Sequence, residues 1–414
     1  MPRGIKNEVQ IPLEGKLSLL GLFLTISTGK WGSWIGIPDS PFFLIDFVIF
    51  SAAVIAFLKM LYIREIIDFY TLSLFFFIVV QLSRKSESEL FVRFQDISPF
   101  VYLLLVPFLT HCLRSIALRN FILVLRFGSL SNLTIFYLTY FEILKPFDCG
   151  SICGSDLFYY RADHVALVSC IGIMAWSSFP NCKLKSQTPV ILLFVIGIML
   201  NQSRVGILGL VIVILLFTLP RVRKVTNLKR LNLKGAVISI MIVMFGTLIL
   251  SWDLSTNSGI QRVSEESVFA QISGAADGTT RARIIAQGIL IRYVFNENGD
   301  YMFGAAPGSE MVRDSQAFRY LSGASDVRAP HNWFVGLLAR YGIFGYVFWL
   351  IGVIYYFKLG SDQKKNFTLG SVATIIILTF SFFGVMMESP FGAIPFAYFL
   401  SSKIAYSGKQ TRSH

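Results

Sequence analysis

The residues best placed to do chemistry are a histidine and an asparagine, His331 and Asn332, directly before a long apolar stretch. They follow the longest hydrophilic segment of the chain, residues 253–330. The ordinary pKa of histidine lies near physiological pH. At the mouth of a membrane helix it can therefore act as a general base on a group held at the lipid surface. The other interpretation is an interfacial histidine with a hydrogen-bonded ring, and the motif alone does not separate the two.

Four arginines precede or open predicted helical stretches. Arg204 and Arg161 stand before apolar stretches, and Arg281 and Arg283 begin an amphipathic one, residues 282–294. A planar guanidinium suits phosphate oxygens, so each could bind an anionic lipid headgroup. Each also has a plainer interpretation. Arg204 could anchor a helix by extending its charged end to the membrane interface. Arg281 and Arg283 could be ordinary solvated charges, and Arg161 could flank a capped helix start.

Metal and nucleotide chemistry find no support in the sequence. No histidine, cysteine and carboxylate cluster has the spacing of a metal site, so we expect no metal and no cofactor. No Gly-rich phosphate loop, nucleophile elbow or Rossmann fingerprint is present. Cys112 and Cys170 lie in apolar stretches and should be buried. Cys149 and Cys153 fall in a predicted outer loop, where an oxidising compartment would let them pair.

Composition indicates a polytopic membrane protein. Hydrophobic residues make up 54% of the chain and charged residues 15%, whereas soluble domains are about 45–50% apolar and about 25% charged. The formal net charge is +13. The excess is concentrated in loops, above all residues 221–234, which fits a cytoplasmic loop better than nucleic-acid binding.

We therefore expect an all-α polytopic membrane protein with about 12 transmembrane helices and one large, partly helical outer loop, judging each helix against the ~20 apolar residues needed to cross. Loop charges put both termini inside and the loops 145–163 and 253–330 outside. The mixed charges of loop 83–96 fit this rule poorly. The predicted spans are 17–37, 41–60, 66–82, 97–113, 120–144, 164–179, 188–202, 204–220, 235–252, 331–357, 367–387 and 390–406.

The chain divides into three predicted parts. Residues 1–252 form the first nine transmembrane helices, residues 253–330 the outer loop, and residues 331–414 the last three helices with a cytoplasmic tail. Within the outer loop, Gly304 to Gly308 read as a turn.

Arg340 needs a partner under this scheme. In a continuous helix it would lie about 13 Å beyond His331. A charge at that depth in a bilayer is costly unless it is paired. Glu388 and Asp46 are the acidic candidates, and the sequence does not choose between them.

Taken together, the motifs resemble the signature of bacterial O-antigen ligases and the related O-antigen polymerases. The resemblance covers roughly residues 155–345. The motifs occur in the same order along the chain and on the same predicted side of the membrane, which makes the combination more specific than any single motif. Its pieces are Tyr160-Arg161, Ser203-Arg204-Val205-Gly206, the arginine-led stretch at Arg281 or Arg283, Phe303-Gly304-x-x-x-Gly308, His331-Asn332 and Gly342-x-x-Gly345.

The resemblance implies a metal-independent glycosyltransferase of surface polysaccharide biosynthesis in the bacterial inner membrane. Its donor would be an oligosaccharide on undecaprenyl pyrophosphate, presented at the periplasmic face, and its acceptor a sugar hydroxyl. A polymerase would add the glycan to another lipid-linked repeat unit, whereas a ligase would add it to lipid A core. We favour the polymerase. A polymerase could also work with a partner protein, a chain-length co-polymerase. A transporter of lipid-linked oligosaccharides is the alternative of another class.

The same resemblance suggests roles for the candidate residues. Arg204 and Arg281 would neutralise the leaving pyrophosphate, and His331 would orient or deprotonate the acceptor hydroxyl. The residues that would contact the pyrophosphate or the glycan beside them are Arg283, Arg161 and Asn332.

Overall fold

The computed structural model of the chain describes residues 10–33, 35–36, 43–84, 90–147, 157–178, 184–201, 203–218, 290, 301–309, 332–359, 369–384, 386–388 and 390–407. Over these ranges the regular elements are helices, with two isolated β-bridges, Gly36 to Phe43 and Phe147 to Leu157. The predicted all-α fold is confirmed for this part of the chain.

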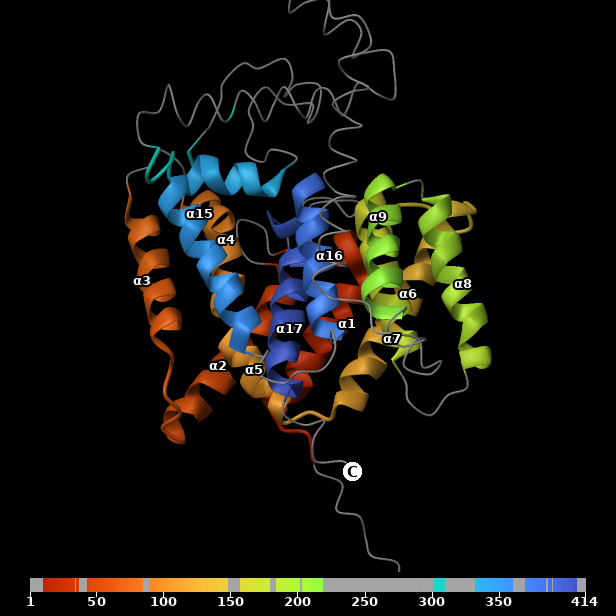
Figure 1. Cartoon of the computed structure of the whole chain (residues 1–414), viewed down its shortest axis with the longest axis horizontal. Helices are drawn as coiled ribbons and strands as arrows, with labels where there is room; N and C mark the ends of the chain where they lie inside the picture. Colours follow the sequence, from red (N-terminus) through yellow and green to blue (C-terminus); the bar gives the residue numbers. More distant parts are fainter. Residues whose placement is uncertain are drawn as a thin grey trace, which may run out of the picture.

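The described helices follow the predicted apolar stretches closely, and the stretch 235–252 lies outside the described residues. In chain order the helices are α1 (Leu13–Ser33), α2 (Leu44–Tyr62), α3 (Phe69–Ser83), α4 (Leu90–Leu104), α5 (Val106–Arg114), α6 (Leu118–Tyr140), α7 (Ala162–Ser177), α8 (Leu184–Leu200), α9 (Arg204–Ile212) with a π-helical end (Val213–Thr218), α15 (Trp333–Leu359), α16 (Leu369–Phe383), the 3-10 turn η4 (Met386–Glu388) and α17 (Pro390–Tyr406) (Figure 1).

Several of these helices are suited to a membrane. Among the described residues, three are long and apolar enough to cross one, namely α2, α6 and α15, and the bent pair of α4 and α5 makes a fourth. Five shorter apolar helices lie in α3, α7, α8, α9 and α16. The chain is therefore a membrane protein, and the count of about 12 spans remains a prediction.

The core of the bundle is built around α17, which lies at its centre in Figure 1. Nearly every residue of this helix is buried, and it contacts α1, α4, α5, α15 and α16. A helix that is apolar on all sides is stable only when other helices surround it. Large apolar side chains of α3, such as Phe69 and Phe76, are exposed instead, as expected for a surface that faces lipid.

One predicted span is wrong in its extent and shape. Residues 97–113 are not a single helix, because α4 begins at Leu90 and bends by 41° into α5. Pro107 stands in the first turn of α5. It has no N–H to donate to the preceding turn, so it favours a helix start over a continuous helix. Arg93 and Asp96, predicted in a loop, consequently lie on α4.

The predicted continuous helix after His331 is also wrong. α15 breaks at Gly342, whose φ is 63° and ψ −169°. Figure 1 shows the first part of α15 lying across the top of the bundle and the second part running down into it. A positive φ favours glycine, because it has no Cβ. Because the break follows Arg340, this residue stays on the first part of α15, which does not run down into the bundle.

Candidate active site

The starts of α7 and α9 lie together at one end of the bundle. Asn201, in the turn before α9, donates a side-chain hydrogen bond to the carbonyl of Ala162, in the first turn of α7. Gly206 allows the close approach, since a Cβ added there would lie 2.7 Å from the Cβ of Ala166. The glycine of the Ser-Arg-Val-Gly motif thus has a packing role, and it brings Arg204 to the start of α7.

Each of these two helix starts carries a candidate arginine. Arg204 is the first residue of α9, after Ser203, whose hydroxyl accepts a hydrogen bond of 3.1 Å from Gly206 N–H. The structure describes the backbone of Arg204 and not its side chain. Arg161 precedes the first turn of α7, and its Nη2 lies 3.4 Å from Asp163 Oδ2. Because a helix start carries a partial positive charge, this end of the bundle favours anions.

The start of α15 joins the same end. Trp333 N–H donates to the carbonyl of Gly384, just past α16, over 3.2 Å. A Cβ added to Gly384 would lie 3.6 Å from Asp163 Oδ2. The first residues of α15 therefore lie near the first residues of α7, so Asn332 and Arg161, far apart in sequence, belong to one end of the fold.

Asn332 caps α15. Its Oδ1 accepts hydrogen bonds from Phe334 N–H at 3.0 Å and Val335 N–H at 3.3 Å, and the residue is buried. An asparagine in this position satisfies backbone donors that would otherwise have no partner. It also fixes the direction in which the chain enters the helix. His331, Arg281 and Arg283 lie outside the described residues, so their approach to this end stays a prediction.

The turn predicted from Gly304 to Gly308 is confirmed, with φ of 68° at Gly304 and 84° at Gly308, whereas the side of the membrane on which it lies stays a prediction. It packs directly on the bend of α15. Ala305 N–H donates to Ala339 O, and Ile343 N–H donates to Tyr301 O, each over 3.0 Å.

Two motif glycines make this contact possible. A Cβ added to Gly304 would lie 2.5 Å from the backbone carbon of Arg340, and one added to Gly342 would lie 2.4 Å from that of Met302. No heavy atom fits at such distances, so both backbones can touch because neither glycine carries a side chain.

Arg340 pairs with Asp96 on α4, and the two side chains are each 8% exposed. The sequence candidate Asp46 was therefore wrong, and the side chain of the other candidate, Glu388, lies outside the described residues. Asp46 instead accepts hydrogen bonds from the Tyr102 hydroxyl, at 2.7 Å, and from a backbone N–H. The mixed charge of loop 83–96, which fitted the topology rule poorly, was the signal that could have pointed to an ion pair there.

The same region is held by further contacts. Asp96 Oδ2 accepts from Gly308 N–H over 2.7 Å, and the Tyr341 hydroxyl donates to Asp96 O over 2.6 Å. Arg84, at the end of α3, donates to the carbonyls of Phe303 and Gly304 over 2.6 and 2.8 Å. The turn, α3, α4 and the bend of α15 are thus joined by hydrogen bonds and one ion pair.

Of the other predictions, Cys112 and Cys170 are buried and free, as expected. Cys149 and Cys153 fall outside the described residues. Within the described ranges, no group of three or more histidine, cysteine, aspartate or glutamate residues could hold a metal ion.

Comparison with known proteins agrees with the motifs. Residues 189–350 match a family model described as O-antigen ligase. The matched range contains most of α8, all of α9, the turn at Gly304 to Gly308 and the bend of α15. It supports the family of O-antigen ligases and polymerases, whose members are glycosyltransferase-like enzymes. No curated protein matches the chain.

Proposed function

We propose that this chain, as a member of the O-antigen ligase and polymerase family, polymerises lipid-linked oligosaccharide repeat units at the periplasmic face of the inner membrane. The donor is a glycan on undecaprenyl pyrophosphate, and the acceptor is a sugar hydroxyl of a second lipid-linked unit. A ligase would differ only in the acceptor, lipid A core, and it is the second candidate because the matching family model is that of O-antigen ligases.

The observation that carries this proposal is the meeting of three helix starts. α7, α9 and α15 begin at one end of the bundle, with Arg161 and Arg204 at two of these starts and Asn332, which follows His331 in the sequence, at the third. Positive helix ends and guanidinium groups attract the same ligand, a diphosphate. An acid–base group beside such a ligand is what glycosyl transfer to a hydroxyl needs.

In the proposed reaction the bond between the sugar's anomeric carbon and the pyrophosphate oxygen breaks, and a bond from the acceptor hydroxyl oxygen to that carbon forms. The hydroxyl proton passes to His331, and undecaprenyl pyrophosphate leaves with the electron pair. Arg204 and Arg281, or Arg283 in the other register, stabilise the negative charge that develops on the leaving group. Arginines in this role take the place of a metal ion.

The contacts at the two ends of the bundle support the proposed sidedness. Arg84 and Asp96 belong to the loop 83–96, which the span order puts outside, and they bind the turn of residues 301–309; Asp96 also pairs with Arg340. Two ion pairs hold the opposite end, Lys59 with Glu14 at 2.7 Å and Arg114 with Glu65 at 2.9 Å. Those residues belong to the segments whose charge predicts a cytoplasmic location.

The test uses purified protein in lipid nanodiscs with an undecaprenyl-pyrophosphate-linked repeat unit. Products that grow by whole repeat units without any other acceptor identify a polymerase. Transfer that requires added lipid A core identifies a ligase. If neither product forms, and sealed vesicles containing the protein instead move the lipid-linked glycan across the bilayer, the chain is a transporter and the proposal fails.

A further inference from the structure

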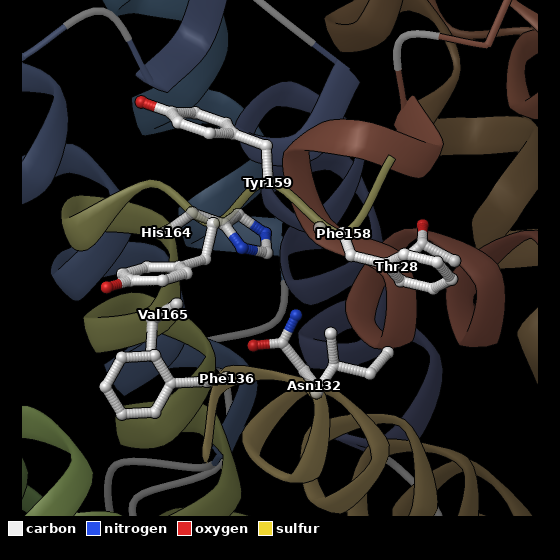
Figure 2. Close-up of a pocket in the computed structure, with 10 residues that line it drawn as sticks. Thr28, Asn132, Phe136, Phe158, Tyr159, His164 and Val165 are labelled. Atoms are coloured by element: carbon white, nitrogen blue, oxygen red, sulfur yellow. The ribbon is translucent and has the colours of Figure 1, made fainter. Parts of the chain in front are cut away.

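A small pocket with two unsatisfied polar atoms lies where α1, α6 and α7 meet (Figure 2). His164, at the start of α7, and Asn132, on α6, reach it from two helices. The His164 side chain is 2% exposed, and its Nε2 has no hydrogen-bond partner among the described residues. Asn132 is 7% exposed, and its Oδ1 likewise has none there. Buried polar atoms nearly always have a partner, so this pair points to a bound group.

The orientation of the Asn132 side-chain amide is set by the hydrogen bond of its nitrogen. Its Nδ2 donates to the backbone carbonyl of Ser27 over 3.3 Å. That bond assigns the amide nitrogen to α1 and leaves the oxygen of this pocket-lining residue without a partner among the described residues. The pocket therefore offers a carbonyl-type acceptor and an imidazole nitrogen.

The backbone of α1 makes room for the imidazole. Gly29 interrupts α1 with a φ of 64°, and a Cβ added there would lie 2.7 Å from His164 Nδ1. On another side the ring packs edge-on against Phe391, with centroids 5.2 Å apart. The imidazole is thus held in place by packing, and a bound group would meet it in a fixed position.

The size of the pocket limits the ligand to one small group. Its volume is about 10 Å³, roughly that needed for one water or one hydroxyl. A hydroxyl matches the chemistry, because it can donate to Asn132 Oδ1 and also pair with His164 Nε2. Aromatic rings surround the space, with Phe136 and Tyr160 packed edge-on at 5.0 Å and Tyr159 40% exposed at the rim. Such rings suit the apolar face of a sugar.

The pocket adjoins the candidate active site. His164 stands three residues after Arg161 on the same chain segment, and Asp163 between them lies near Gly384, which binds the start of α15. We propose that this pocket is a saccharide subsite, in which His164 and Asn132 bind one hydroxyl of the lipid-linked glycan while the sugar ring rests on Tyr159 at the rim. This inference rests on the proposed function and adds the residues that recognise the sugar part of the substrate.

The experiment measures binding of two lipids to the full-length protein in nanodiscs. One probe is the undecaprenyl-pyrophosphate-linked repeat unit, extracted from the bacterium that produces this protein. The other probe is undecaprenyl pyrophosphate without sugar. The variants are His164→Phe and Asn132→Leu, which keep approximate shape and remove the polar atoms. The matched control is His111→Phe, the same change on α5 beside Glu65, at the other end of the bundle.

We expect both pocket variants to bind the glycan lipid about tenfold more weakly, as for a lost hydrogen bond to a buried group. Binding of the sugar-free lipid should stay unchanged, and the control should bind both lipids as the parent does. Unchanged binding of the glycan lipid in both variants would overturn the inference and leave the pocket as a water site. Equal loss for the two lipids, with an unchanged melting temperature, would overturn it too. A parent protein that binds neither lipid contradicts the proposed function itself. The two variants act on different helices, so if one fails to fold, the other still gives the test.

Discussion

Arg340 of α15 and Asp96 of α4 form an ion pair whose two side chains are each 8% exposed. The pair ties the bend of α15 to a helix far away in the sequence, and Asp96 also accepts a backbone hydrogen bond from Gly308. A buried ion pair of this kind adds little stability by itself, but removing one partner leaves an uncompensated charge.

The first prediction concerns this pair. Arg340→Ala and Asp96→Ala should each destabilise the protein by about 3–5 kcal/mol, and the double variant should lose less than the sum, because it leaves no lone charge. Thermal unfolding in detergent measures this. Arg114→Ala is the matched control: its pair with Glu65 is exposed, 52% and 31%, so the change should be below about 1 kcal/mol. Additive losses at Arg340 and Asp96 would show that the two residues act independently.

The second prediction concerns the bend itself. Gly342→Ala should lower protein yield and melting temperature sharply, since φ is positive and the new Cβ would lie 2.4 Å from the Met302 carbonyl carbon. Gly384→Ala is the control, because its nearest contacts would be ordinary ones at 3.5 and 3.6 Å. Size-exclusion profiles and melting curves compare the two. A fully stable Gly342→Ala would show that the turn of the outer loop does not press on this bend.

Much of the fold could be predicted from the sequence, because the apolar stretches are long and periodic and their helices begin near the predicted residues. The exceptions have local physical causes. Gly342 looks like an ordinary helix-packing glycine until its contact with Met302 is known. Pro107 starts a new helix within a stretch that is apolar throughout.

The candidate site was predicted less completely. Arg161, Arg204 and Asn332 could be proposed because helix starts and motifs are visible along the chain. The partner of Arg340 and the pocket at His164 could not, since both depend on contacts between helices remote in sequence. His164 in particular lies opposite Asn132 of α6, 32 positions earlier in the chain, and nothing in the sequence pairs the two.

The third prediction separates a capping role of Asn332 from a direct contact with substrate. Asn332→Ala should cost about 1 kcal/mol of stability and also lower activity, because the residue before it loses its fixed direction. Asn332→Ser keeps an oxygen that can cap the helix and should restore most of both. Melting temperature and glycan transfer are measured together. Restored stability without restored activity would assign Asn332 to the substrate instead.

The fourth prediction tests topology. In a background with Cys149→Ser and Cys153→Ser, a membrane-impermeant maleimide should label Ser267→Cys in intact cells and spare Asn232→Cys. The reason is the charge of segment 221–234, which should keep it in the cytoplasm. Permeabilised cells serve as the control, since both cysteines should react there. Labelling of Asn232→Cys in intact cells would reverse the assigned sides of the membrane. It would then contradict the proposal that the reaction takes place at the outer face.

The last prediction separates the charge role of Arg204 from the acid–base role of His331. Arg204→Ala should abolish most transfer, whereas Arg204→Lys should retain part of it, because lysine keeps the charge but loses the planar fork that binds phosphate. His331→Ala should lower the rate by about 10²–10⁴, the usual cost of losing a general base. In binding assays the two positions should differ: undecaprenyl pyrophosphate should bind weakly to Arg204→Ala and normally to His331→Ala. Transfer by the parent protein should also persist in EDTA. Loss on chelation with recovery on adding a divalent ion would replace the arginine mechanism by a metal-dependent one, and a fully active His331→Ala would return His331 to the role of an interfacial residue.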